Sequence, residues 1–168
     1  MEKLRGLAWR FGDNIDTDQI IPARYCNTLD PGVLADHAME GADPDFSRRV
    51  APGDIVVAGR NFGCGSSREA APIALKAAGI GAVVADSFAR LFYRNAVNIG
   101  LFILVCPAAS GFIETGEELA IDPQAGIVHS LTTGRAFRGE SFPSYIREIV
   151  DAGGMVEYVK KRLGKDKD

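Results

Sequence analysis

Two serines and an arginine follow one another in a glycine-rich stretch of the sequence. Ser66 and Ser67 carry hydroxyl groups that donate and accept hydrogen bonds, and Arg68 carries a planar guanidinium that matches a carboxylate or a phosphate. Gly63 and Gly65 permit a backbone with positive φ and a close approach to a ligand. These residue types predict an anion site with hydroxyl groups beside it.

The stretch joins a predicted strand to a predicted helix. Residues 54–58 are an apolar, β-branched run typical of a buried strand, and residues 70–78 are an alanine-rich run typical of a helix. The first amides of a helix lack internal partners and carry the positive end of its dipole, which favours a bound anion. We expect the regular helix to begin near Ala71 with Pro72 at its first position, because a deeper proline would remove a hydrogen bond.

The same stretch also fits, or nearly fits, three other motifs. Ser66 to Glu69 fits the S-x-x-E pattern of a capping box, which is a purely structural role. A P-loop is excluded, because Cys64 stands where that motif needs glycine and no lysine follows. The dinucleotide fingerprint fails at Arg68, where it needs its third glycine. A non-catalytic anion-binding or regulatory module remains the alternative function of another class.

Longer motifs give the chain a resemblance to a known family. The run Gly63-Cys64-Gly65-Ser66-Ser67-Arg68-Glu69 occurs with Asp16-Thr17-Asp18 upstream and Ser87-Phe88-Ala89 downstream. In this order the motifs resemble the aconitase family, and nearly the whole chain resembles the separate small subunits of 3-isopropylmalate dehydratase and homoaconitase. The resemblance implies an α/β fold, the swivelling β/β/α three-layer domain. Its mixed sheet has parallel core strands and antiparallel C-terminal strands.

The resemblance also implies an activity, the removal and re-addition of water on a hydroxy-dicarboxylic acid. Isomerisation of 3-isopropylmalate to 2-isopropylmalate in leucine biosynthesis ranks first, and a related hydratase of methylmalate, dimethylmalate or homoaconitate is the alternative. Ser66 would be the base that takes a carbon-bound proton, while Ser67 and Arg68 would hold a substrate carboxylate. The supporting residues would be Asp16, Thr17, Asp18, Asn61, Gly63 and Gly65.

The cysteines indicate what this chain does not bind. Cys26, Cys64 and Cys106 are widely separated and form no C-x-x-C pair, so we expect no metal or iron–sulfur cluster on this chain. In the resembled enzymes a [4Fe–4S] cluster with an open iron sits on a large subunit. The expected partner is therefore a cluster-bearing large subunit, and the chain alone would hold half an active site.

Residues 23–49 are predicted to be the least regular part, and the resemblance makes them a mobile loop that reads the substrate side chain. Its candidate contact residues are Arg24, Cys26, Asn27 and Thr28. Asn27 carries no charge to balance an extra carboxylate, whose burial without a cation is costly. A small or mildly polar substrate side chain is therefore expected, and Arg24 is the nearby cation that could change this.

Length and composition predict one domain over residues 1–168, with a frayed tail at about 164–168. The 168 residues are 46% hydrophobic and 24% charged, as in globular proteins. A net charge of −3 without a basic stripe argues against nucleic acid, and no apolar run reaches the roughly 20 residues that span a bilayer. The N-terminus lacks the apolar core of a signal peptide. We expect a cytoplasmic protein without a nucleic-acid or membrane partner.

The remaining elements are predicted from periodicity and turn residues. Strands are expected over 3–11, 81–85, 101–106, 118–122 and 126–131, and helices over 31–39, 88–98, 144–150 and 155–163. In the helix over 88–98 we expect Ser87 as the N-cap, with Arg90, Arg94 and Asn95 on a solvated face.

Overall fold

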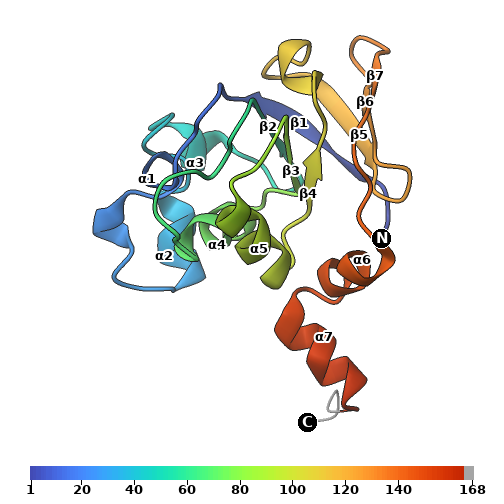
Figure 1. The fold of residues 1–168 in the computed structure, drawn as a ribbon. Coiled ribbons are helices and arrows are strands. Elements are labelled where there is room, and N and C mark those ends of the chain that lie inside the picture. Colours follow the sequence, from blue (N-terminus) through green and yellow to red (C-terminus); the bar gives the residue numbers. More distant parts are fainter. Residues whose placement is uncertain (165–168) are drawn as a thin grey trace.

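The structure is a computed structural model that describes residues 1–164, so the tail predicted to fray lies almost entirely outside the described residues. Within residues 1–164, seven strands form one sheet in the order β4-β3-β2-β1-β5-β6-β7 (Figure 1). The parallel strands are β1 (Leu4–Arg10), β2 (Ile55–Ala58), β3 (Ala82–Ala85) and β4 (Ile103–Val105), and the antiparallel ones are β5 (Glu118–Asp122), β6 (Ile127–Ser130) and β7 (Ala136–Arg138). The mixed α/β class is confirmed, although β7 was not predicted.

Helices accompany mainly the parallel half of the sheet. They are α1 (Thr17–Ile20), α2 (Pro31–Asp36), α3 (Phe46–Arg49), α4 (Ala70–Ala77), α5 (Arg90–Asn98), α6 (Ser144–Asp151) and α7 (Met155–Arg162), with 3-10 turns η1 (Ala23–Tyr25) and η2 (Ala109–Gly111). In Figure 1, α2, α4 and α5 lie along one side of the parallel strands, while α7 projects away from the sheet. The parallel half is therefore the covered half, as parallel sheets generally are.

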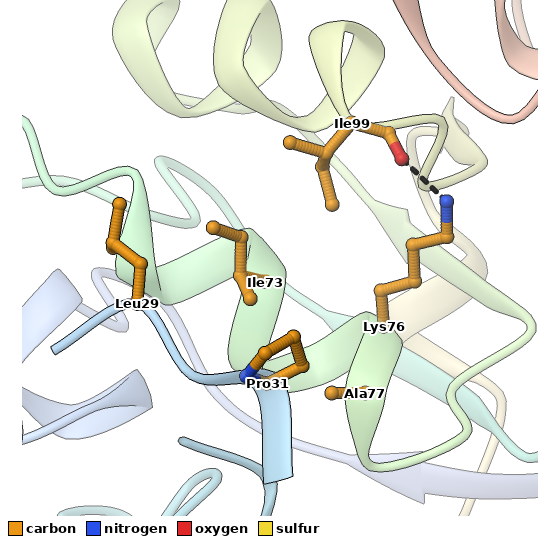
Figure 2. A pocket seen from close by; sticks show the side chains of 6 residues that line it. All are labelled: Leu29, Pro31, Ile73, Lys76, Ala77 and Ile99. Carbon is orange, nitrogen blue, oxygen red and sulfur yellow. Dashed lines mark hydrogen bonds between the residues drawn. The ribbon is translucent and has the colours of Figure 1, made fainter. Parts of the chain in front are cut away.

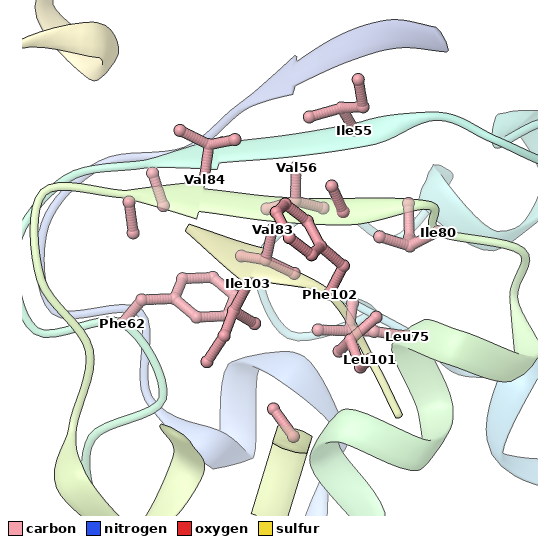
Figure 3. Packing of buried hydrophobic residues seen from close by; sticks show 14 of the residues in the cluster. Ile55, Val56, Phe62, Leu75, Ile80, Val83, Val84, Leu101, Phe102 and Ile103 are labelled. Carbon is pink, nitrogen blue, oxygen red and sulfur yellow. The ribbon is translucent and has the colours of Figure 1, made fainter. Parts of the chain in front are cut away.

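The core lies between the parallel strands and these helices. Every residue of β2 and of β3 is buried, which explains why both strands appear in the sequence as continuous apolar runs. Figure 3 shows Val56 and Val83 on the strands, with Leu75 of α4 and Phe62 in the same buried cluster. This packing fixes β2 and β3 side by side, so the loops at their carboxyl ends emerge together.

The segment over residues 23–49 is more regular than the sequence indicates, because it contains η1, α2 and α3. Asp30 caps α2, accepting hydrogen bonds from the amides of Gly32 at 2.9 Å and Val33 at 3.2 Å, with Pro31 at the first position. The helix ends before Met39, whose φ of +58° leaves the helical region.

The starts of α4 and α5 differ from what the sequence predicts. Helix α4 begins at Ala70 after Glu69, and no side-chain cap is present, so the S-x-x-E sequence does not form a capping box. Pro72 was predicted to be the first helical residue and is the third, where its missing N–H is still one that no carbonyl of the helix would have bonded. Helix α5 begins at Arg90 without a side-chain cap, and Ser87 Oγ accepts from another backbone amide instead.

Candidate active site

The glycine-rich turn after β2 is bonded on one side to the segment before and within α1. The Gly63 amide donates to the Ile15 carbonyl at 2.7 Å, and the Thr17 amide donates to the Cys64 carbonyl at 2.8 Å. The Thr17 hydroxyl also donates to the Ser66 carbonyl at 3.0 Å. The turn is thus extended as a short parallel bridge against the Asp-Thr-Asp motif.

On its other side the turn is bonded to the segment that follows β3. The Phe62 amide donates to the Ser87 carbonyl at 3.0 Å, and the Ala89 amide donates to the Phe62 carbonyl at 2.9 Å. Asn61, with a φ of +60°, donates its amide to Ser87 Oγ at 2.8 Å and its side-chain Nδ2 to Asn14 Oδ1 at 3.1 Å. The three motifs that stand far apart in the sequence therefore meet at the carboxyl ends of β2 and β3.

Gly63 and Gly65 of the turn differ in the space that a side chain would have at each position. Both have positive φ, +80° for Gly63 and +89° for Gly65. A Cβ at Gly63 would lie 2.2 Å from Cγ of Phe92, whereas a Cβ at Gly65 would come no nearer than 3.5 Å, to Cβ of Asp16. Gly63 therefore allows the turn to pack on α5, and Gly65 serves only the backbone conformation.

A pocket of about 230 Å³ opens where the turn faces α5. Its lining includes Ser66, Ser67 and Arg68 of the turn with Thr17 of α1, and, from α5 and the residue before it, Ala89, Arg90, Leu91, Phe92 and Asn95. Both serine side chains are exposed to solvent at the pocket. The structure thus brings the predicted base and the predicted carboxylate-binding residues to one cavity.

Arg68 is oriented by a carboxylate of the Asp-Thr-Asp motif. Its Nη1 donates to Asp18 Oδ1 at 3.0 Å and lies 3.4 Å from the Ile21 carbonyl oxygen, and only 22% of its side chain is exposed. The hydrogen bond from Arg68, followed by that from the Ala23 amide, lowers the pKa of Asp18 below its usual value. The carboxylate therefore stays charged and holds the guanidinium beside the pocket.

The other two residues of that motif support the site through the backbone. Asp16 is the N-cap of α1, accepting from the Gln19 amide at 2.8 Å in a capping box. Thr17 is buried and bonds the turn with both its amide and its hydroxyl. The motif thus fixes the turn without offering a group that must react.

Two pocket residues were missed by the sequence analysis. Arg90 and Asn95 were assigned to a solvated face, yet both line the pocket. The position of Arg90 in the sequence could have indicated its place at the pocket, because it directly follows the Ser-Phe-Ala motif after β3. Ligands of open α/β sheets bind outside the carboxyl ends of neighbouring parallel strands.

The predicted substrate-loop residues lie outside the lining of this pocket. Arg24 pairs with Glu40, and Cys26 Sγ lies 3.6 Å from the Pro22 carbonyl oxygen. Asn27 is exposed, and Thr28 Oγ1 accepts from the Asp30 amide at 3.1 Å. Their contact with a substrate side chain stays a prediction.

A separate cavity of about 440 Å³ lies between the start of α2, α4 and the end of α5 (Figure 2). Its walls are apolar except for Lys76, whose Nζ donates to the carbonyls of Ile99 and Gly153. Burial lowers the pKa of Lys76, but the amine is already engaged by these two acceptors. The cavity therefore lacks the converging polar groups that distinguish the serine-lined pocket.

The described residues offer no ligand set for a metal ion. Within residues 1–164 no group of three or more histidine, cysteine or acidic side chains is placed to hold one. Cys26, Cys64 and Cys106 are free thiols, and burial raises the pKa of the Cys106 thiol to about 11. In the same part of the chain, no helix has the length and apolar character that crossing a membrane requires.

A mixed sheet whose serine- and arginine-bearing turn is braced by two further motifs defines an aconitase-type swivelling domain. Residues 36–109 match the family model of the aconitase C-terminal domain. The fold superposes on the crystal structure of a 3-isopropylmalate dehydratase from Methanocaldococcus jannaschii with a TM-score of 0.93 and 45% identity, covering 98% of this chain and 97% of that chain.

Curated relatives agree with the structural match. The chain is 55% identical to 3-isopropylmalate dehydratase small subunit 1 of Methanopyrus kandleri, over 94% of this chain and 93% of the relative. It is 54% identical to the 2,3-dimethylmalate dehydratase small subunit of Eubacterium barkeri, over 94% of this chain and 96% of the relative. The chain belongs to the aconitase family, in its group of dehydratase small subunits, which confirms the predicted family and fold.

Proposed function

We propose that this chain is the small subunit of a hydro-lyase that isomerises 3-isopropylmalate to 2-isopropylmalate by dehydration and rehydration, in leucine biosynthesis. The observation that carries the proposal is that Ser66, Ser67 and Arg68 line one pocket. The Methanopyrus kandleri relative carries the corresponding name. The name of the Eubacterium barkeri relative favours 2,3-dimethylmalate as the runner-up substrate.

Ser66 is the base in this proposal. It takes the proton from a substrate carbon, the electrons of that C–H bond form the double bond, and the hydroxyl on the neighbouring carbon leaves with its bonding pair. A serine hydroxyl is a weak base precursor, so it needs nearby amides and the charge of Arg68 to stabilise its anion. Rehydration reverses these steps with the hydroxyl added to the other carbon.

Ser67 and Arg68 hold a substrate carboxylate while this happens. The guanidinium forms two parallel hydrogen bonds with a carboxylate only if its plane is held, and the hydrogen bond to Asp18 helps to hold it. Because Arg68 is mostly buried and paired, it reaches the substrate without first losing side-chain freedom.

The rest of the site belongs to a partner in this proposal. A [4Fe–4S] cluster on a large subunit would act as the Lewis acid for the departing hydroxyl. A pocket of about 230 Å³ falls below the roughly 300–1,000 Å³ of complete small-molecule sites, which fits a cavity that a second subunit closes. The free thiols fit the reducing cytoplasm, and neither nucleic acid nor a membrane enters the proposal.

We treat residues 1–168 as one domain in this proposal. Within it, the segment over residues 23–49 is the substrate loop: the side chains of residues 24–28 move against the substrate side chain, while the turn at Met39 to Gly41 stays bonded to α1. It is the region in which the alkyl group of one malate would be distinguished from that of another.

Coexpression with the cluster-bearing large subunit tests the function. We expect the two chains to copurify, iron to follow the large subunit, and dehydratase activity to require both. Robust turnover by the isolated, iron-free chain would contradict the proposal. Tight carboxylate binding by the isolated chain, with an inactive complex, would instead favour the anion-binding module.

A further inference from the structure

A second arginine lies near the site with its charge bound by a cluster of side chains. Arg24 Nη2 donates to Glu40 Oε1, and its guanidinium carbon lies 4.6 Å from the centroid of the Tyr25 ring. Glu40 Oε1 also accepts from the Tyr25 hydroxyl at 3.1 Å, and Glu40 Oε2 lies 2.6 Å from His37 Nδ1. The Tyr25 and His37 rings stack at 3.6 Å between centroids. One carboxylate therefore holds three side chains of the segment over residues 23–49.

The turn that carries Glu40 is fixed to α1. The Met39 amide donates to the Ile20 carbonyl at 2.7 Å, and the Gly41 amide donates to the Gln19 carbonyl at 3.1 Å. A Cβ at Gly41 would lie 2.6 Å from Cα of Gln19, so the two backbones are in close contact. Glu40 is therefore the anchored member of the cluster, and Arg24, with 63% of its side chain exposed, is the member free to leave.

Arg24 directly follows Ala23, whose amide donates at 3.0 Å to Asp18 Oδ1, the oxygen that also accepts from Arg68 Nη1 at 3.0 Å. Asp18, which orients Arg68, has its pKa lowered by hydrogen bonds from Arg68 and the Ala23 amide and further by the charges of Arg68 and Arg24. Both arginines thus act on one carboxylate beside the pocket. If Arg24 were released from Glu40, its guanidinium would become a second cation for a substrate to meet.

We propose that Glu40 is a specificity-determining residue: it holds the Arg24 guanidinium out of the substrate site, so that the site accepts malates with a neutral side chain. This inference rests on the proposed function. While it is bonded to Glu40, the Arg24 guanidinium is held in the cluster and outside the lining of the pocket, whereas a released guanidinium forms charge-assisted hydrogen bonds with a substrate carboxylate. The Arg24–Glu40 pair therefore disfavours substrates whose side chain ends in a carboxylate, because such a carboxylate finds no free guanidinium to bind.

The test compares two malates in the complex with the large subunit. One is 3-isopropylmalate, and the other is homoisocitrate, a malate whose side chain ends in a carboxylate. Glu40→Gln keeps the shape of residue 40 and removes its charge. We expect the ratio of kcat/KM for homoisocitrate to kcat/KM for 3-isopropylmalate to rise at least about tenfold, the size of one charge-assisted bond.

Two control variants identify the cause of any rise. In the double variant Arg24→Met with Glu40→Gln, the gain should disappear because no guanidinium is left to release. In His37→Gln, Glu40 loses one partner but keeps Arg24, so the ratio should stay within about twofold of wild type. A gain that survives without Arg24, or an equal gain in His37→Gln, would overturn the inference, since loosening of the segment would then explain it.

The remaining outcomes are also decisive. An unchanged ratio in an assembled Glu40→Gln complex overturns the inference while leaving the proposed function standing. If that variant fails to assemble, Glu40→Asp replaces it, because a carboxylate one methylene shorter holds Arg24 less well, and a ratio that then rises less than about threefold overturns the inference. A wild-type complex that is inactive on every alkylmalate contradicts the proposed function itself, and the inference falls with it.

Discussion

Arg68 pairs with Asp18 of α1 and Arg24 pairs with Glu40 in the turn bonded to α1, yet the two regions that carry these arginines are built differently. The turn before Arg68 is bonded through its backbone to segments on both sides, and Arg68 itself is 22% exposed. Arg24 is 63% exposed and is held through side chains alone, by Glu40 and the ring of Tyr25. Ser66, which must reach a reacting carbon, needs a turn held through its backbone. A residue that only distinguishes one substrate from another can be held through side chains.

The largest effect should come from the backbone-braced turn. Ser66→Ala removes the proposed base, so kcat of the complex should fall by about 10²–10⁴-fold or more. The fold should be unaffected, because Ser66 is exposed and the bond to Thr17 uses its backbone carbonyl. Steady-state kinetics and thermal unfolding measure the two quantities, and activity within about tenfold of wild type would contradict the assignment.

A matched pair of glycine variants sharpens the statement that the turn is fixed by packing. Gly65→Ala should cost about 1–2 kcal/mol of unfolding free energy, the strain of a left-handed alanine. Gly63→Ala should cost about 1–3 kcal/mol more, because its Cβ would overlap Phe92. Urea unfolding of both variants checks this, and equal costs would mean that the turn does not pack on α5 as described.

Arg68→Lys tests whether the guanidinium acts as a fork and not simply as a charge. Lysine keeps the charge but cannot bind Asp18 and a substrate carboxylate in one plane. Losing one charge-assisted bond costs about 1.5–3 kcal/mol, so kcat/KM should fall at least about tenfold. Arg48→Lys, at an exposed pair with Asp45, is the control and should leave kcat/KM unchanged.

The smallest effect is expected in the side-chain-held region. Asn27→Arg adds a cation at an exposed position while the Arg24–Glu40 pair stays intact. Activity toward homoisocitrate should rise about three- to tenfold relative to 3-isopropylmalate, a partial charge-assisted bond at an exposed site. If the wild-type complex already prefers homoisocitrate, or if Asn27→Arg brings no gain, this segment does not read the substrate side chain.

The two regions also differ in how far the sequence could predict them. The turn was found because glycines, hydroxyls and an arginine between a strand and a helix have few other uses. The cap expected at Ser87 was wrong, because its hydroxyl accepts from the Asn61 amide, 26 residues away in the sequence. Arg90 and Asn95 were missed because a helical pattern gives the faces of a helix but not the loop that lies against one of them.

The side-chain cluster around Arg24 could not be predicted from the sequence. Its members come from η1, from His37, the C-cap residue of α2, and from a turn in which Met39 is left-handed. That turn is set by amides that bond to the backbone of α1, a tertiary contact without a local sequence signal. The segment looked irregular for the same reason, since its short helices depend on packing more than on propensity.

Hydrogen exchange at the substrate carbon tests the central claim most directly. The complex with the large subunit is incubated with 3-isopropylmalate in deuterated water, and deuterium at the carbon that loses its proton is followed by NMR. We predict exchange with wild type and with Asn27→Arg, and its loss in Ser66→Ala while the complex and its iron remain intact. Exchange at the wild-type rate in Ser66→Ala would show that another group takes the proton and would contradict the account.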